Sequence, residues 1–260
     1  MKALITGASS GIGAEFARRF AAQGYDLIIT GRRKEQLEHV AEEIRAKYGR
    51  EVTIKLGDLA DAAHLAELTD LITKSSDLDV LINNAGHGLK RHFVEDDTPN
   101  ESDLLIDLHL RASLHLMHAA IPGMTARKRG TIINVSSIAG FSPTASDPTY
   151  GATKAFLTFF SEALYLVLQE KGIKIQALCP GFTWTNFHEK LGIAKEQQTH
   201  RGILRWTTPD KVVDASLKAL QNGTVVCIPG FLNKIAMKIV ALIPRKLYYR
   251  TMKGRTMRRR

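Results

Sequence analysis

The chain alternates short apolar runs with longer stretches in which apolar residues recur every three or four positions. The short runs predict buried strands and the longer stretches predict amphipathic helices. The predicted strands are 2–6, 26–30, 51–56, 78–82, 131–135, 174–179 and 224–228. The predicted helices are 14–23, 33–48, 62–73, 101–126, 151–171 and 208–222. This alternation, without Pro-rich breaks, predicts one α/β domain over residues 1–230. We expect a doubly wound parallel sheet of about seven strands with helices on both faces.

A glycine-rich turn joins the first predicted strand to the first predicted helix. It reads Gly7-Ala-Ser-Ser-Gly11-Ile-Gly13. Glycines at this position permit a tight turn and let backbone N–H groups and the helix dipole approach a pyrophosphate. We therefore expect a Rossmann-type sheet that binds a dinucleotide, with an ordinary tight turn as the alternative. The cofactor-binding residues predicted here are Gly7, Ser9, Ser10, Gly11, Ile12 and Gly13.

The second predicted strand ends in Gly31-Arg32-Arg33, and no acidic residue lies in 27–34. A fold of this kind that prefers NAD places an acidic residue here, whereas a basic residue accommodates the 2′-phosphate of NADP. Arg32 and Arg33 therefore predict that NADP(H) is preferred over NAD(H). The alternative is that both arginines only begin a solvated helix.

The third and fourth predicted strands end in further candidate cofactor contacts. Asp58 and Leu59 follow the third strand, and Asn84, Ala85 and Gly86 follow the fourth. Ligands of doubly wound sheets bind at the carboxyl ends of the strands, where these residues would lie. Asp58 is equally consistent with a simple turn residue.

Tyr150 and Lys154 are four residues apart at the start of a predicted helix, so they occupy one helix face. A neighbouring ammonium favours the ionised phenol and is expected to lower the pKa of Tyr150. Tyr150 is therefore a candidate general acid or base for a substrate carbonyl or hydroxyl. Ser137 follows the predicted strand 131–135 and could bond the same oxygen. From spacing alone, a solvated helix start is the simpler interpretation.

Composition and charge narrow the class of protein. Hydrophobic residues make up 44% and charged residues 24% of the 260 positions, which is typical of a globular protein. Cys179 and Cys227 predict neither a disulfide framework nor a metal site. The first residues run directly into a strand, which favours the cytoplasm over secretion. No apolar stretch is expected to reach the ~20 residues that cross a bilayer.

The motifs together resemble those of the short-chain dehydrogenase/reductase family, in its compact single-domain branch. The matching segments are Thr6-Gly-Ala-Ser-Ser-Gly-Ile-Gly13, Asp58, Asn83-Asn-Ala-Gly86, Ile133-Asn-Val-Ser-Ser137, Tyr150-x-x-x-Lys154 and Pro180-Gly-x-x-x-Thr185. They follow the family's order and spacing over residues 1–230. The spacing also selects Ser137, 13 positions before Tyr150, over Ser136.

The resemblance implies roles for these residues. Tyr150 would transfer the substrate proton, and Ser137 would orient the substrate oxygen. Lys154 would hold the nicotinamide ribose and lower the pKa of Tyr150. Pro180, Gly181, Thr183 and Thr185 would contact the nicotinamide end of the cofactor, as would Tyr150 and Lys154.

His109 is a departure from the family pattern. The family usually carries an Asn at this position, where it holds a water in a proton relay, whereas this chain has Asp107-Leu-His-Leu-Arg111. An imidazole can bond a water or carry a proton itself, with a changed pH profile. A chain that binds cofactor and turns over poorly, or a satisfied core histidine, are the alternatives. His109, His115 and His118 match no metal-site spacing, so no metal is predicted.

Two segments have no counterpart among these motifs. Residues 182–206 are rich in aromatic side chains and predict a mobile apolar lid, and hence a small hydrophobic carbonyl or alcohol substrate. Residues 231–260 form a basic amphipathic extension with ten of the 36 Lys and Arg and none of the 26 Asp and Glu. The extension could lie on an anionic membrane, cover the substrate cleft or a second subunit, or be a plain packed helix. Nucleic acid is the least favoured partner.

The leading hypothesis is an NADP(H)-dependent oxidoreductase that interconverts a ketone or aldehyde and an alcohol, acting as a homodimer or homotetramer. The rival is a cofactor-binding protein with little turnover that docks on a membrane or a partner through its basic tail. The intact trio of Ser137, Tyr150 and Lys154 favours the enzyme. We expect a cytoplasmic protein, with contact to the inner membrane surface if the tail binds lipid.

Overall fold

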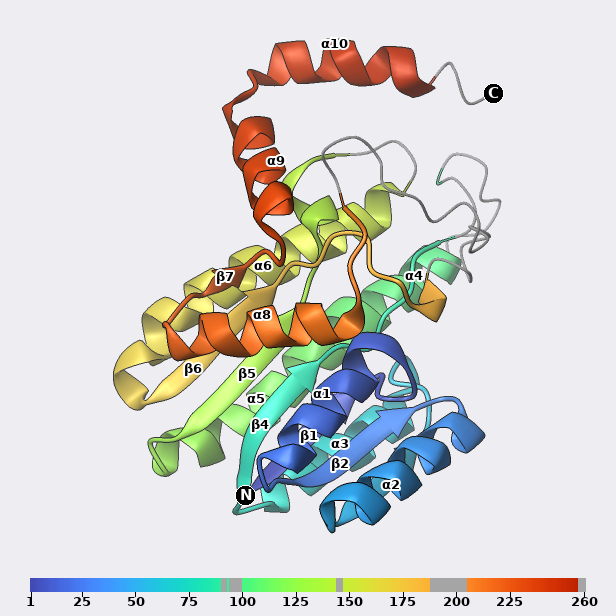
Figure 1. Ribbon diagram of the computed structural model, residues 1–260, viewed down its shortest axis with the longest axis vertical. Coiled ribbons are helices and arrows are strands. Elements are labelled where there is room, and N and C mark those ends of the chain that lie inside the picture. The colour runs from blue at the N-terminus through green and yellow to red at the C-terminus, as the bar shows by residue number, and fades with distance from the viewer. Residues whose placement is uncertain (90–92, 94–99, 144–146, 188–204, 257–260) are drawn as a thin grey trace.

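A seven-stranded parallel sheet forms the centre of the molecule (Figure 1). The computed structural model describes residues 1–89, 93, 100–143, 147–187 and 205–256. The strands are β1 (Lys2–Thr6), β2 (Asp26–Gly31), β3 (Val52–Leu56), β4 (Leu78–Asn83), β5 (Gly130–Val135), β6 (Ile173–Leu178) and β7 (Val226–Cys227). Their order in the sheet is β3-β2-β1-β4-β5-β6-β7. The predicted α/β fold is confirmed. The order reverses between β1 and β4, which opens a crevice at the carboxyl ends of the strands.

Helices cover both faces of this sheet. One face carries α1 (Gly11–Ala22), α2 (Lys34–Tyr48) and α8 (Pro209–Gln221), and the other carries α3 (Ala62–Lys74), α5 (Ala112–Ala126) and α6 (Pro148–Leu168). The short α4 (Asn100–Ile106) leads toward α5. Two hydrophobic cores result, one on each side of the sheet.

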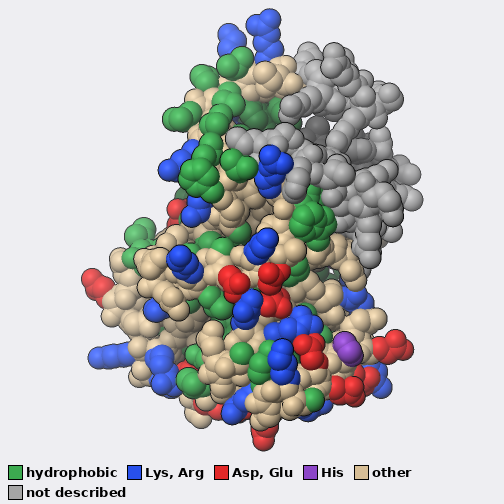
Figure 2. Space-filling model, in the orientation of Figure 1, with side chains coloured by type: hydrophobic (Ala, Val, Ile, Leu, Met, Phe, Trp, Pro, Cys, Tyr) green, Lys and Arg blue, Asp and Glu red, His purple; other side chains and the backbone are tan. Residues whose placement is uncertain are grey.

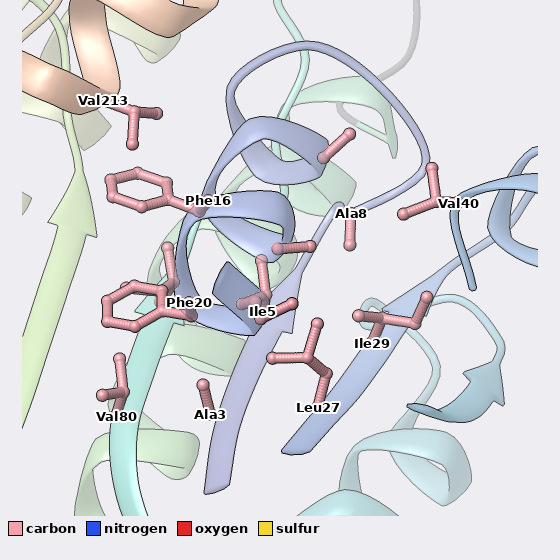
Figure 3. Close-up of a cluster of buried hydrophobic side chains, with 14 of the residues drawn as sticks. Ala3, Ile5, Ala8, Phe16, Phe20, Leu27, Ile29, Val40, Val80 and Val213 are labelled. Atoms are coloured by element: carbon pink, nitrogen blue, oxygen red, sulfur yellow. The ribbon is translucent and has the colours of Figure 1, made fainter. Parts of the chain in front are cut away.

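Alternate residues of each central strand enter opposite cores, because successive side chains of a strand point to opposite faces. Ala3 and Ile5 of β1 pack in the core that contains Phe16 and Phe20 of α1, whereas Leu4 packs in the other core. Figure 3 shows the first of these cores, with the rings of Phe16 and Phe20 beside β1. Burial of each such phenyl ring contributes roughly 1.5–3 kcal/mol. Burial on both faces explains why these strands read as continuous apolar runs.

The predicted helix over 101–126 is not one regular helix. A π-helical turn over Asp107–Arg111 separates α4 from α5. Apolar periodicity could not reveal this turn, because one wider turn barely changes the pattern of a long helix. The last strand is also shorter than predicted and pairs with β6 only at Val226 and Cys227.

One helix of the described residues is long and apolar enough to span a membrane, Pro148–Lys171, with a mean hydropathy of 1.2. The expectation that no stretch approaches this length is wrong for this segment. The helix meets this criterion by its length and composition alone. In the structure the helix packs on β5 and β6 and buries Lys154, Leu157 and Ser161.

The basic extension forms two helices, α9 (Phe231–Leu242) and α10 (Arg245–Thr256). Pro244 lies between them and cannot continue α9 as a helix, since it lacks the backbone N–H. Figure 1 shows α9 leaving the body and α10 running across its far end. The predicted lid is only partly described. Residues 188–204 lie outside the described residues, and within the rest Phe182 stacks on Trp206 with ring centroids 5.2 Å apart.

Candidate active site

A cavity of about 690 Å³ lies at the carboxyl ends of the strands. All the predicted site residues line it except Gly13 and His109. The residues concerned are Gly7, Ser9, Ser10, Gly11, Ile12, Arg32, Arg33, Asp58, Leu59, Asn84, Ala85, Gly86, Ser137, Tyr150, Lys154, Pro180, Gly181, Thr183 and Thr185. They come from six different connections of the sheet, so the fold gathers them around one space.

The glycine turn forms one wall of this cavity. Gly7 and Gly11 have φ angles of +64° and +59°, a region that favours glycine. A Cβ on Gly13 would overlap the carbonyl oxygen of Gly7, so only a glycine at this position leaves room for the turn. α1 begins here without a side-chain cap at Ser10 and without an acidic residue in its first turn. The N–H groups of that turn suit an anion such as a pyrophosphate.

Thr6 and Asn84 hold the glycine turn to the end of β4. The backbone N–H groups of Asn84 and Ala85 both donate to Thr6 Oγ1 at 2.9 Å. The Asn84 Nδ2 donates to the carbonyl oxygens of Thr6 at 2.9 Å and Gly7 at 3.1 Å. Asn84, predicted to contact the cofactor, therefore uses its side-chain donor inside the protein. Thr6 was not predicted as a site residue, although it precedes the glycine turn directly.

The two arginines after β2 differ in their surroundings. The Arg33 guanidinium donates to Ser9 Oγ at 2.8 Å and to Ser10 Oγ at 2.6 Å. Arg32 pairs instead with Asp58 at 3.1 Å, and both side chains of that pair are largely exposed. Asp58 Oδ1 also accepts a hydrogen bond from the N–H of Ala60. This contact is expected of a turn residue, which was the alternative interpretation of Asp58. Arg33 thus lies beside the glycine turn, where a 2′-phosphate of a bound dinucleotide would need a cation.

Ser137, Tyr150 and Lys154 form the opposite wall. Lys154 is 5% exposed, and its Nζ donates to the Val135 carbonyl at 2.9 Å while lying 5.6 Å from the centroid of the Tyr150 ring. Asp147 caps α6 by accepting the Tyr150 N–H at 2.9 Å, and its other oxygen accepts the Leu89 N–H at 2.9 Å. Asp147 therefore places Tyr150 relative to the loop after β4.

Burial changes both ionisable groups of this wall. Burial raises the pKa of the Tyr150 phenol to about 12, against a hydrogen bond with Ser137 that lowers it. Burial also lowers the pKa of the Lys154 ammonium to about 8. Tyr150 is half-buried and lines the cavity.

The lowering of the Tyr150 pKa by Lys154 stays a prediction. In this structure burial is the main influence on that pKa, and Lys154 directs a donor to Val135. A phenol with a raised pKa stays protonated at neutral pH. In this form it can donate a proton to a carbonyl oxygen.

The comparison with known proteins decides the family. The family model for short chain dehydrogenase matches residues 1–196. The chain belongs to the short-chain dehydrogenase/reductase family. It is accordingly an NAD(P)-dependent oxidoreductase of alcohols and ketones.

Three proteins illustrate the likeness. A short-chain dehydrogenase from Sphingobium yanoikuyae in complex with NADPH has 34% identity and a TM-score of 0.83, covering 94% of this chain and 96% of that one. A bulky-bulky ketone specific alcohol dehydrogenase from Comamonas testosteroni has 31% identity and a TM-score of 0.78, covering 94% of both chains. The NADP-dependent 3-hydroxy acid dehydrogenase YdfG of Shigella flexneri is 33% identical over 83% of this chain and 87% of its own length.

His109 lies behind the wall that contains Tyr150, in the π-helical turn, and is 1% exposed. Thr153 Oγ1 donates to the Tyr150 carbonyl, so its oxygen accepts the hydrogen of His109 Nδ1 at 2.9 Å. His109 Nε2 then accepts the His87 N–H at 3.3 Å. Both ring nitrogens are therefore used inside the protein. The bonds favour a buried histidine that supports Tyr150, with ring centroids 5.7 Å apart.

Several other residues that line the cavity were not predicted as site residues, among them His87, Asp147 and Met237. Phe187, of the predicted lid segment, also lines it. Phe187 lies against Tyr150 with ring centroids 5.8 Å apart. Met237 belongs to α9 and is far from every motif in sequence, so spacing could not reveal it. Asp147 could have been predicted from the sequence, since an Asp directly before a Pro at the start of a helix is a common N-cap residue.

We predict that His109 stays neutral across the working pH range. Burial, with Lys154 and His87 nearby, holds the pKa of its imidazole well below the usual value. In an NMR titration, the His109 ring signals, assigned with a His109→Asn variant, should not shift between roughly pH 5.5 and 8. A midpoint close to that of free imidazole would contradict this assignment.

Proposed function

We propose that this chain is an NADP(H)-dependent oxidoreductase that interconverts a bulky apolar ketone or aldehyde and its alcohol. The observation that carries the proposal is the pairing of two walls around one cavity. Ser137, Tyr150 and Lys154 form one wall, and the open N-terminus of α1 beside Arg33 forms the other. A cavity of about 690 Å³ suits a dinucleotide together with a substrate at its reactive end.

Ser137, Tyr150 and Lys154 have different roles in the protonation of the substrate oxygen. A bound NADPH supplies the hydride. Tyr150, kept protonated by burial, donates its proton to the carbonyl oxygen as negative charge develops there. The Ser137 hydroxyl donates a hydrogen bond to the same oxygen. The buried Lys154 ammonium stabilises the tyrosinate that remains, and this attraction exists only once the proton has moved.

Lys154 is placed to serve the cofactor as well. Its bond to the Val135 carbonyl uses one of the three ammonium donors and leaves two for the nicotinamide ribose and the phenol. Pro180, Gly181, Thr183 and Thr185 also line the cavity and are proposed to hold the nicotinamide end. Asp58 and Leu59, at the far side, are proposed to border the adenine.

Two observations support NADP(H) over NAD(H). Arg33 lies within hydrogen-bond distance of both serines of the glycine turn, and no acidic residue occupies the end of β2. In addition, one similar structure contains NADPH and one similar enzyme is named as NADP-dependent.

The cavity wall supports an apolar substrate. Leu89, Phe182, Phe187 and Met237 line its outer part. A similar structure is that of a bulky-bulky ketone specific alcohol dehydrogenase. The proposed lid over 182–206 would close on such a substrate.

An exposed apolar stripe on α6 supports a homodimer or a dimer of dimers. Phe156, Phe159, Leu166 and Val167 are 38–76% exposed on the side of α6 that faces away from the sheet. Their spacing forms one continuous ridge on the helix. A second copy of the chain would cover this ridge through a two-fold contact.

We predict that Arg33 decides the cofactor preference. Arg33→Ala should narrow the difference in binding free energy between NADPH and NADH by roughly 1–3 kcal/mol, the size of a charge-assisted hydrogen bond to a phosphate. Arg32→Ala should have a smaller effect, because Arg32 is already paired with Asp58. Fluorescence quenching measures both dissociation constants. Lys34→Ala, at an exposed position of α2, is the matched control, and wild-type protein that binds NADH as tightly as NADPH would rule the preference out.

We predict that Tyr150→Phe retains NADPH binding but loses turnover by about 100-fold or more. The substrate is first found by screening a library of carbonyl compounds for loss of NADPH absorbance. Tyr165→Phe on the same helix, away from the cavity, is the matched control. Near-normal turnover by Tyr150→Phe would refute the acid role. Tight NADPH binding without consumption by any carbonyl would favour the rival, a cofactor-binding protein with little turnover.

We predict that Phe159→Glu dissociates the dimer, because a carboxylate in the apolar ridge would lose its water without gaining a partner. Sedimentation velocity measures the oligomeric state. Leu56→Glu, at an exposed position of β3, is the control and should leave it unchanged. A wild-type chain that sediments as a monomer would disprove the α6 contact.

A further inference from the structure

The helix α9 packs on the body through its less apolar side. Asn233, Ala236 and Met237 are buried there, and Asn233 Nδ2 donates to the Pro229 carbonyl at 3.1 Å. The larger apolar side chains are on the opposite side of the helix. Phe231 is 76%, Ile239 50% and Leu242 83% exposed. Within the part of the chain that the structure describes, the more hydrophobic face of α9 is therefore exposed.

The following helix continues this exposed surface. Tyr248 is buried and its hydroxyl donates to the Pro143 carbonyl at 2.6 Å, which fixes α10 to the segment before the catalytic tyrosine. Leu247 and Tyr249, on either side of Tyr248, are 52% and 57% exposed. Figure 2 shows hydrophobic and Lys or Arg side chains gathered together on this protruding part of the molecule.

The charged side chains of the extension are all basic. Residues 231–260 contain ten Lys and Arg and no Asp or Glu, while the remaining chain is balanced. Lys234 and Lys238 flank the apolar face of α9, and Arg245, Lys246 and Arg250 are exposed on α10. A helix with an apolar face beside basic side chains matches the interface of a bilayer with anionic headgroups.

We propose that α9 and α10 dock this protein on an anionic lipid bilayer. The tail surface that does so consists of Phe231, Leu232, Ile239, Leu242, Leu247 and Tyr249 with the lysines and arginines around them. The apolar side chains enter the headgroup region, and the basic groups bind lipid phosphates while their methylene stems remain in contact with the apolar layer.

The charge distribution favours a bilayer over a second copy of this chain. A two-fold contact would bring two extensions together, each basic and without an acidic residue, so like charges would face one another across the interface. Nucleic acid would satisfy the charge but offers nothing to the exposed Phe231 and Leu242. Anionic lipid satisfies both features of the surface.

Docking would also place the cavity beside the membrane. Met237 of α9 lines the cavity from the body side of the same helix whose other side carries Phe231 and Leu242. An apolar substrate dissolved in the bilayer would then have a short path to the site. This consequence rests on the proposed function, whereas the docking itself does not.

Cosedimentation of the full chain with vesicles tests the proposal without any substrate. We expect the protein to sediment with phosphatidylglycerol–phosphatidylcholine vesicles at low salt and to be released as salt rises. Vesicles of phosphatidylcholine alone should retain far less. The double variant Lys234→Gln with Lys238→Gln should bind roughly 30-fold more weakly. Phe231→Ser with Leu242→Ser should lose on the order of 100-fold.

Matched controls separate this surface from general effects. Lys211→Gln with Lys218→Gln on α8, and Leu56→Ser with Leu104→Ser, change the same residue types at exposed positions elsewhere and should bind like the wild type. Circular dichroism checks that each variant is folded. Wild-type protein that ignores anionic vesicles at low salt would overturn the proposal, as would tail variants that bind normally. If the Phe231 and Leu242 variant instead dissociated a dimer in the absence of vesicles, the face would belong to a second copy.

Discussion

The parallel pairing of β1 with β4 is the constraint on which the rest of the structure depends. Crossovers run one way from β1 through β2 to β3 and the other way from β4 onward, so the connections separate above this pair. Thr6 closes the base of the gap by binding both N–H groups that follow β4. The glycine turn, the loop after β4 and the start of α6 all border the space that remains. The site therefore results from the topology of the sheet, and its residues only need to lie at strand ends.

Burial then determines what the polar groups around that space can do. Burial is the largest influence on the pKa of both Tyr150 and Lys154, raising that of the phenol and lowering that of the ammonium. A protonated phenol and a lysine of reduced pKa suit donation of a proton to a carbonyl. His109 shows the same effect more strongly, since two internal hydrogen bonds and complete burial keep it neutral. His109 lies behind Tyr150, with the two ring centroids 5.7 Å apart.

The C-terminal helices connect this site to the outer surface. α9 presents Met237 to the cavity and Phe231 and Leu242 to the outside, and Tyr248 ties α10 to the segment that precedes Tyr150. A ligand on the outer face of α9 would therefore contact an element that also borders the substrate. Under the two proposals, one short helix serves both the substrate site and the lipid-docking surface.

The sequence by itself determined the order of strands and helices along the chain, the glycine turn and the motif residues that border the cavity. Local patterns suffice for these because strand burial has a period of two, helix burial a period near 3.6, and glycine turns need specific residues. Only the tertiary structure decided which neighbour each group meets. Arg33 rather than Arg32 donates hydrogen bonds to the serines of the glycine turn. The Asn84 side chain bonds to the backbone at that turn, and α9 exposes its more apolar face. These outcomes depend on contacts between segments far apart in the chain, and on the water that such contacts exclude, neither of which a local pattern contains.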